Sequence, residues 1–513
     1  MPYLSLSSMN LKSLYGPLVA LLLTACANEA TLPTDYSAAQ DTLRLYPDYC
    51  NVVIPPNIAP LNVQVKSEGD EFVASFAGNG HEMIVQADED GKLLLDSVKW
   101  RELLIANRGK DVTVGIYAHR SSGEWVKYPD YTITVAQEEI DPYLSYRLIE
   151  PSYELYRQLG LYQRNLTNFS EAAIYENNRT YDHQNNHCVN CHNYQGYETK
   201  RMLFHVRANH GGTVFVENGK ARKMNMKSDS VLSNCVYPSW HPSRNWVAFS
   251  SNRTGQAFHM TNPEKVEVVD YGSDLVFFDV DKNTLSHILK TPDDMETFPC
   301  WAPDGKRLFY CSAHTPFMTE VPDSAQSDAV LTRYDSIRYN LMSIPFDAET
   351  RTFGTPVVEM QCDTLGRSAT LPRVSPDGRY VLFTLGDFGQ FHIWHKSSDL
   401  YVKDLQDGTI RPLAEANSDD VDSYHTWSSN GRWIVFSSRR DDGSFTRPYI
   451  SYFDREGHAH KAFLLPQADP ELNLLRLKSY NVPELTKEAV RISPEELRKV
   501  IYDDAQMGKV NYK

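Results

Sequence analysis

Apolar and polar residues alternate with a period of two along most of this chain, in short runs separated by turn residues. The runs EFVASFAG, HEMIVQAD and VTVGIYAH, all between residues 52 and 137, are examples. A period of two places successive side chains on opposite faces of a strand, so one face can be buried while the other meets solvent. Because many short strands follow one another here, we predict an immunoglobulin-like β-sandwich over residues 45–140.

The C-terminal half repeats one pattern. A bulky residue stands two places before a turn, and an alternating apolar strand and a second hairpin follow. Pro-Asp-Gly and Ser-Asn-Gly are residues typical of tight turns. The aligned segments are Tyr237–Ser251, Phe298–Ser312, Leu371–Leu385 and Tyr424–Ser438. Four strands per repeat predict a β-propeller. A partial blade at Met202–Met226 makes five recognisable blades over residues 201–470, and six are possible.

The segment between these two β regions has a different character. The run IEPSYELYRQLG (Ile149–Gly160) predicts a short helix that ends at glycine, and a helical turn is expected behind Ser170. We therefore predict a short helical connector over residues 141–200. A helical tail is predicted over residues 471–513, where Ser493 and Glu496 form a capping box with Pro494 at the first helical position. The fold class as a whole is mainly β.

The N-terminus has the pattern of a lipoprotein signal peptide. Lys12 precedes an apolar run over residues 14–25, which has the length of a signal-peptide core and is too short to span a bilayer. Leu23-Thr24-Ala25-Cys26 resembles the bacterial lipobox. We expect a signal peptide over residues 1–25, a lipid on Cys26 and a linker over 26–44, hence a membrane contact through the lipid. By resemblance to known sorting rules, Ala27 favours the outer membrane of the bacterial envelope, and the membrane face stays open.

Charge and cysteine content restrict the partners further. The formal net charge is −15, with 51 Lys and Arg against 66 Asp and Glu. Since no basic run offsets this charge, a nucleic-acid partner is excluded from the expectations. The eight cysteines of an exported protein lie in an oxidising compartment, where disulfides are permitted. Cys300 and Cys311 flank a predicted hairpin, and a disulfide between them or two buried thiols are both open.

One motif carries specific chemistry. His187-Cys188-Val189-Asn190-Cys191-His192 contains Cys-x-x-Cys-His, the attachment signature of c-type haem. Two thiols form thioethers with the haem vinyl groups, and the adjacent His192 becomes the proximal ligand of the iron. Cell-envelope export agrees with this, because such haem is attached outside the cytoplasm. Candidate distal ligands are His210, Met202 and His205.

Two other interpretations of the motif stay open. His183, His187, Cys188, Cys191 and His192 include enough ligands for a tetrahedral zinc site. Cys188 and Cys191 are also spaced for a disulfide or a redox-active thiol pair. Several further histidines lie near predicted blade loops, where a propeller binds ligands at one mouth of the ring; they are His241, His259, His314, His392, His395 and His425. The chain has no Gly-x-Ser-x-Gly elbow, which argues against a serine hydrolase.

From about residue 44 to 483 the chain resembles an envelope lipoprotein family with a TolB-like or WD-like propeller and one haem-c motif. The resemblance rests on Ile54–Asn62, Asp141–Tyr156, Cys188–Tyr194, Met202–Thr213, the Pro-Asp-Gly blades and Asp419–Arg440. It implies the architecture and the haem attachment residues, and little about substrate. His187, directly before the motif, departs from the family pattern and favours the zinc alternative slightly.

Three functions follow as hypotheses, and the chain's status as an enzyme stays open among them. The first is a lipid-anchored cytochrome that transfers single electrons, with the propeller docking a redox partner protein of the envelope. The second is a non-catalytic binding scaffold for another envelope component, in which Cys188 and Cys191 form a disulfide or a zinc site. The third is a haem enzyme with an open distal position. An electron carrier or binding protein is favoured over an enzyme.

Overall fold

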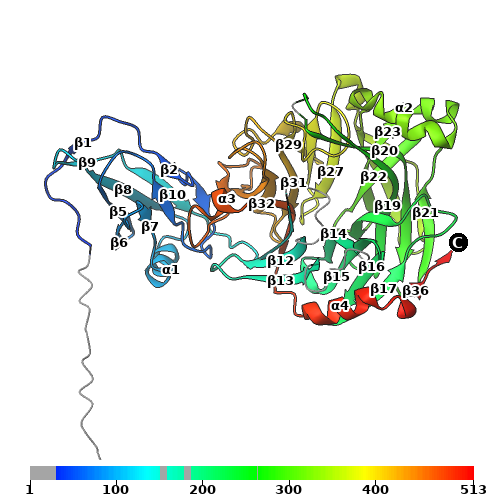
Figure 1. Ribbon diagram of the computed structural model, residues 1–513, viewed down its shortest axis with the longest axis horizontal. Helices are drawn as coiled ribbons and strands as arrows, with labels where there is room; N and C mark the ends of the chain where they lie inside the picture. The colour runs from blue at the N-terminus through cyan, green and yellow to red at the C-terminus, as the bar shows by residue number, and fades with distance from the viewer. Residues whose placement is uncertain (1–29, 151–158, 178–185, 263) are drawn as a thin grey trace, which may run out of the picture.

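The computed structural model describes residues 30–150, 159–177, 186–262 and 264–513. These residues form a β-sandwich from the N-terminal strands at one end and a ring of β-sheets at the other (Figure 1). The predicted mainly β fold class, with a sandwich followed by a propeller, is confirmed.

The sandwich has two sheets. In the larger sheet, β8 pairs with β5 on one edge and with β9 and β10 on the other, and β6, β1 and β3 extend it. Its strands are β1 (Ser37–Ala38), β3 (Val53–Ile54), β5 (Glu71–Gly78), β6 (His81–Gln86), β8 (Asp111–His119), β9 (Trp125–Lys127) and β10 (Tyr131–Val135). The smaller sheet has β2 (Leu45–Tyr46), β4 (Val63–Val65) and β7 (Lys92–Leu93). Helix α1 (Ser97–Ala106) begins behind Asp96, which caps it.

The ring consists of six blades within the described residues, each built on four antiparallel strand positions, and blade 4 has two short strands at its outer position. From the innermost strand outward, they are β35 (Ser479–Thr486), β11 (Tyr143–Ile149), β12 (Gly160–Asn165) and β13 (Glu171–Glu176) in blade 1; β14 (His187–Gln195), β15 (Glu198–Ala208), β16 (Gly212–Glu217) and β17 (Lys220–Asn225) in blade 2; β18 (Cys235–Trp240), β19 (Trp246–Phe258), β20 (Val266–Asp279) and β21 (Thr284–Leu289) in blade 3; β22 (Asp294–Trp301), β23 (Arg307–His314), β24 (Asn340–Asp347) with β25 (Thr352–Phe353) and β26 (Val357–Met360) in blade 4; β27 (Ser368–Val374), β28 (Tyr380–Gly386), β29 (Asp399–Asp404) and β30 (Ile410–Pro412) in blade 5; and β31 (Asp422–Trp427), β32 (Trp433–Ser438), β33 (Arg447–Tyr452) and β34 (Phe463–Leu464) in blade 6.

The ring closes through blade 1, which combines strands from two distant parts of the chain. Strand β35 supplies the innermost position and pairs antiparallel with β11. The six inner strands then contact one another in the order β35, β14, β18, β22, β27, β31 and back to β35. The blade number is therefore six. The propeller extends beyond the predicted 201–470, since it begins at β11 and takes its last inner strand from the predicted tail.

The repeated turns have the predicted chemistry. In three blades an Asp or Asn side chain accepts a hydrogen bond from the backbone N–H two residues later. The pairs are Asp304 with Lys306 at 2.9 Å, Asp377 with Arg379 at 3.1 Å and Asn430 with Arg432 at 3.0 Å. The intervening Gly305, Gly378 and Gly431 have φ of 68°, 76° and 68°, which glycine adopts without a Cβ penalty. These local turns fix the register of each inner hairpin.

The predicted helical connector over residues 141–200 is wrong for the parts that the structure describes. The turn expected behind Ser170 is strand β13, which pairs with β12 and forms the outer edge of blade 1. The helix predicted over Ile149–Gly160 falls largely on residues 151–158, outside the described residues, and its two end residues belong to strands. The haem-type motif itself lies on strand β14. Sheet pairing has overridden a weak local helix preference.

The predicted C-terminal helix is confirmed. Helix α4 (Pro494–Tyr502) has the capping box of Ser493 and Glu496 and packs against β13 and β17. Beyond it, β36 (Gly508–Lys509) joins the outer edge of blade 2 and β37 (Asn511–Tyr512) joins that of blade 3. Two shorter helices, α2 (Gln326–Leu331) and α3 (Leu472–Leu475), lie in connections.

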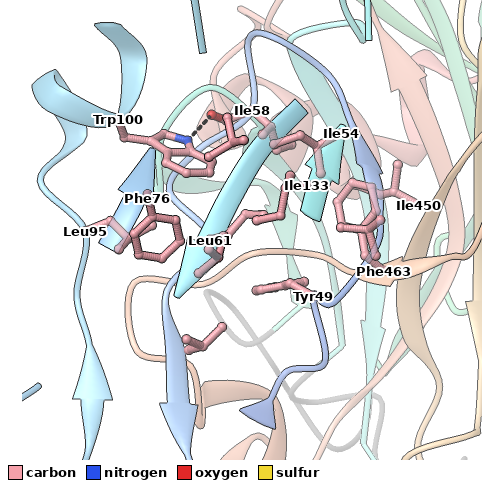
Figure 2. Close-up of a cluster of buried hydrophobic side chains, with 14 of the residues drawn as sticks. Tyr49, Ile54, Ile58, Leu61, Phe76, Leu95, Trp100, Ile133, Ile450 and Phe463 are labelled. Carbon is pink, nitrogen blue, oxygen red and sulfur yellow. Dashed lines mark hydrogen bonds between the residues drawn. The ribbon is translucent and has the colours of Figure 1, made fainter. Parts of the chain in front are cut away.

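The sandwich and blade 6 share one hydrophobic core. Tyr49, Ile54 and Leu61 of the sandwich belong to the same buried cluster as Ile450 and Phe463 of blade 6 (Figure 2). The hydroxyl of Tyr49 also donates to the carbonyl of Leu464 at 3.2 Å. Because the cluster is continuous, the two domains bury apolar surface against each other and not only within themselves.

Replacing Phe463 by Ala should therefore weaken both domains together. Phe463 is 1% exposed, so Phe463→Ala should lower the free energy of unfolding by about 3–5 kcal/mol. Urea unfolding followed by fluorescence measures this. The control is Leu365→Ala, at a side chain that is 63% exposed, where a change within about 0.5 kcal/mol is expected. A variant whose stability equals that of the wild type would contradict the shared core.

Candidate functional site

A cavity of about 330 Å³ lies at the centre of the ring, and its wall includes residues of the inner strands of all blades. Each inner strand contains a β-bulge, marked by a register shift and by one non-glycine residue with positive φ. The six residues are Cys191 (φ 52°), Tyr237 (48°), Phe298 (54°), Leu371 (55°), Tyr424 (49°) and Val482 (48°). All six line the cavity. The bulge in each inner strand therefore places one residue of every blade at the cavity wall.

The Cys-x-x-Cys-His motif occupies this repeated position in blade 2. Cys191 is the bulge residue, and Cys188, Cys191 and His192 all line the cavity. In a regular strand, side chains three residues apart lie on opposite faces. The register shift between Asn190 and Asn193 changes that alternation, so both cysteines reach one cavity.

The repeat containing the motif was missed in the sequence, although a signal was present. The four recognised repeats place a bulky residue three positions after the bulge residue, and Tyr194 and Leu485 occupy that position after Cys191 and Val482. His192 corresponds to a proline in three of those repeats and to His425 in the fourth. Aligning Cys191–Tyr194 and Val482–Leu485 to the template would have revealed the two missing inner strands.

His192 is a neutral, buried imidazole. Burial lowers its pKa to about 3. Its Nε2 has no hydrogen-bond partner among the described residues and lies 3.9 Å from Oε2 of Glu484 on β35. Burial raises the pKa of Glu484 to about 7. A neutral imidazole with a free nitrogen is the form in which histidine binds a metal.

None of the three distal candidates lines the cavity. Met202 is fully buried in the hydrophobic cluster between blades 1 and 2. His205 lies on β15, where burial lowers its pKa to about 3. His210 pairs through Nδ1 with Asp504 at 2.9 Å and packs against the ring of Tyr502. The geometry thus brings together Cys188, Cys191 and His192 and leaves these three residues elsewhere.

The remaining cysteine and histidine candidates are also separated from one another. All seven cysteines of the described residues are free thiols, and Cys300 and Cys311 belong to different hydrophobic clusters. Within the described ranges no three His, Cys, Asp or Glu side chains are arranged to hold a metal ion. His187 instead bonds through Nε2 to the hydroxyl of Tyr175 at 2.7 Å. His183, like Cys26 and the rest of the first 29 residues, lies outside the described residues.

The six loop histidines do not converge at the mouth. Among these six, His392 and His395 are the one pair whose imidazole rings neighbour each other, with centroids 5.3 Å apart. His395 bonds through Nε2 to the buried carboxylate of Glu267 at 2.8 Å, which joins a loop of blade 5 to blade 3. His241, His259, His314 and His425 lie at separate places, and none of the six lines the cavity.

The cavity wall is basic and aromatic. It contains four arginines, Arg147, Arg207, Arg373 and Arg439, and no Asp or Glu among the described lining residues. Trp394 and Phe391 of blade 5 add rings to those of Tyr237, Phe298 and Tyr424. The guanidinium of Arg439 lies 3.4 Å from the ring centre of Trp394, a stacked cation–π contact.

Comparison with known proteins identifies neither a family nor a function. No protein-family model matches the chain, and no curated protein matches it. Among solved structures, it is similar to the β-propeller domain of the Trilobed protease from Pyrococcus furiosus, with TM-score 0.32 and 11% identity over 79% of this chain and 96% of that one. Oligogalacturonate lyase in complex with manganese gives TM-score 0.35 and 13% identity over 53% and 67%.

Prolyl oligopeptidase B from Galerina marginata gives TM-score 0.35 and 10% identity over 63% of this chain. The chain spans only 44% of that protein's length. In the described part of the chain, no helix is both long enough and apolar enough to cross a membrane.

Acidification should destabilise the ring through its buried histidines. Burial lowers the pKa of His425 to about 3, against an ordinary value of 6.5. Between these values the unfolded chain binds a proton that the folded chain excludes, so stability falls as the pH drops below 6.5. His425→Gln should remove up to about 3 kcal/mol of this loss between pH 6.5 and 4.

The measurement is urea unfolding at a series of pH values. The matched control is His458→Gln, at a side chain that is 65% exposed, which should leave the pH profile unchanged. An unaltered acid slope in His425→Gln would contradict the assignment of a neutral buried imidazole.

Proposed function

We propose that this chain is a lipid-anchored protein of the bacterial cell envelope that carries one covalent c-type haem in its propeller. The observation that carries the proposal is the convergence of Cys188, Cys191 and His192 on one cavity, although all three lie on a single strand. Two thiols and a neighbouring imidazole are the groups that c-type haem requires.

The residues around the motif fit this group in their chemistry. Haem presents two vinyl groups, an iron, a flat apolar ring and two carboxylates. The thiols of Cys188 and Cys191 would hold the vinyl carbons, and His192 has a free, neutral nitrogen for the iron. The aromatic and arginine side chains of the wall match the flat ring and the carboxylates. When bound, haem would supply one-electron redox chemistry.

Electron transfer to an envelope protein is the role that we propose for such a haem. A haem in the central cavity would lie beside the 387–398 segment and the long β19–β20 hairpin, which both contribute residues to the cavity wall. These two segments are the docking platform that we propose for a redox partner. This role makes the chain an electron carrier, without a substrate of its own.

A second candidate is a non-catalytic binding propeller that holds no haem. The observation in its favour is that His192 occupies a repeat position at which the other blades have proline or histidine, beside the partly buried Glu484. In that case Cys188 and Cys191 are wall residues, a disulfide or part of a zinc site. The zinc form would need a further ligand from outside the described residues.

Loss of both thiols should abolish covalent haem. We expect Cys188→Ala/Cys191→Ala to give no haem-stained band on a denaturing gel and no pyridine-haemochrome spectrum. The protein is expressed with its leader in a host that has the cytochrome c maturation machinery. The matched control is Cys300→Ala/Cys311→Ala, two buried thiols that do not line the cavity and should leave the haem content unchanged.

A wild-type protein that carries no haem when expressed in that host would contradict the cytochrome proposal and leave the binding propeller as the remaining candidate. A haem band that persists in Cys188→Ala/Cys191→Ala would place the attachment at other residues.

The lipid anchor is tested separately. Cys26→Ser should prevent incorporation of radiolabelled palmitate and move the protein from the membrane fraction to the soluble fraction. Cys50→Ser, at a free and half-buried thiol of the sandwich, is the control and should stay in the membrane fraction. Membrane retention of Cys26→Ser would mean that another contact holds the protein.

A further inference from the structure

The charge of the central cavity is opposite to that of the chain. The formal net charge is −15, yet the described lining residues include four arginines and no carboxylate. Two acidic groups that the arginines influence, the partly buried Glu484 and the buried Asp270, do not line the cavity. A basic cavity in an acidic protein concentrates anions at that place.

Two of the arginines make no direct ion pair with a carboxylate of the described residues, although Glu484 is close enough to Arg373 for the guanidinium to lower the pKa of that carboxyl. Arg147 on β11 and Arg373 on β27 come from different blades, and neither makes an ion pair with a carboxylate of the described residues. Arg147 donates from Nη1 to the carbonyl of Val189 at 3.3 Å, and its buried Nε has no partner. Arg373 donates to the carbonyl of Pro372 at 3.1 Å and also hydrogen-bonds the thiol of Cys300. Since a half-buried guanidinium without a direct ion pair is costly, a bound anion would stabilise both.

The remainder of the wall favours a ligand with flat faces. Tyr237, Phe298 and Tyr424 present rings from three inner strands, and Trp394 presents another from the 387–398 loop. Neutral hydrogen-bonding groups lie among them, including Asn190, Asn481 and Gln256. Rings together with amides bind flat molecules with polar edges, and forked guanidiniums bind carboxylates.

We propose that the central cavity binds a ring-shaped ligand bearing at least two carboxylates, and that Arg147 and Arg373 are its carboxylate anchors. This inference rests on the proposed placement of the ligand in the central cavity, and it adds the ligand's chemistry. Two sources supply that chemistry. One is haem, through its two propionates, and the other is an acidic sugar built of uronic-acid rings.

The first experimental arm tests the acidic sugar in protein that cannot attach haem. Isothermal titration calorimetry on the Cys188→Ala/Cys191→Ala protein compares digalacturonate with the neutral digalactose of equal ring number. We expect the acidic disaccharide alone to bind. Arg147→Gln and Arg373→Gln should each weaken binding about ten- to a hundred-fold, because each removes a charge-assisted hydrogen bond.

The second arm tests the propionates in protein with both cysteines present. Here the fraction of chains that carry covalent haem is measured for Arg147→Gln, Arg373→Gln and the wild type. We expect this fraction to fall several-fold in each variant. Arg491→Gln is the control in both arms, since it removes the same charge from an 83% exposed side chain and should change nothing.

Arg147→Lys and Arg373→Lys keep the positive charge but cannot make two parallel hydrogen bonds to one carboxylate. We expect these variants to have an intermediate effect, which distinguishes carboxylate binding from general misfolding. Thermal unfolding of each variant monitors misfolding. An effect in the sugar arm identifies an acidic sugar, and one in the haem arm identifies the propionates. Unchanged behaviour of both arginine variants in both arms overturns the inference. A wild type without haem removes only the haem arm, so failure of the proposed function stays distinguishable.

Discussion

Closure of the ring by β35 and β11 is the pairing on which the other features depend. Inner strands of a propeller are buried, and their backbone N–H and C=O groups must be paired or they cost free energy. Residues 479–486 supply the innermost strand of blade 1, whose other strands come from residues 143–176. The same pairing brings Glu484 beside His192 and Val482 to the cavity wall. One long-range contact therefore completes both the architecture and the site.

The six bulges determine which side chains line the central cavity of the ring. Each bulge inserts one residue with positive φ, and the side chain at that position meets the cavity. In five blades this residue is tyrosine, phenylalanine, leucine or valine, and in blade 2 it is Cys191. The Cys-x-x-Cys-His motif thus places a cysteine at a position where the other blades have an aromatic or aliphatic residue. Its first cysteine, Cys188, is buried in the hydrophobic cluster between blades 1 and 2.

The sandwich is attached to the ring by apolar burial and by a few polar contacts. Trp433 donates from Nε1 to the carbonyl of Glu138 at 3.1 Å, and Asp141 accepts from the backbone N–H of Ser429 at 2.6 Å. With the shared core around Phe463, these contacts fix the ring relative to the N-terminal domain. The cavity therefore has a defined orientation relative to the sandwich.

The sequence alone determined the features that depend on neighbouring residues: alternating strands, the turns at Asp304 and Asp377, the capping box at Ser493, and the spacing of Cys188, Cys191 and His192. Tertiary structure decided what depends on distant residues. Sheet pairing made residues 171–176 a strand, because helix preference is weak against a paired edge. Ring closure made the blade number six and separated Met202, His205 and His210 from the cavity. The basic wall arises from arginines on distant strands, which only the closed ring brings together.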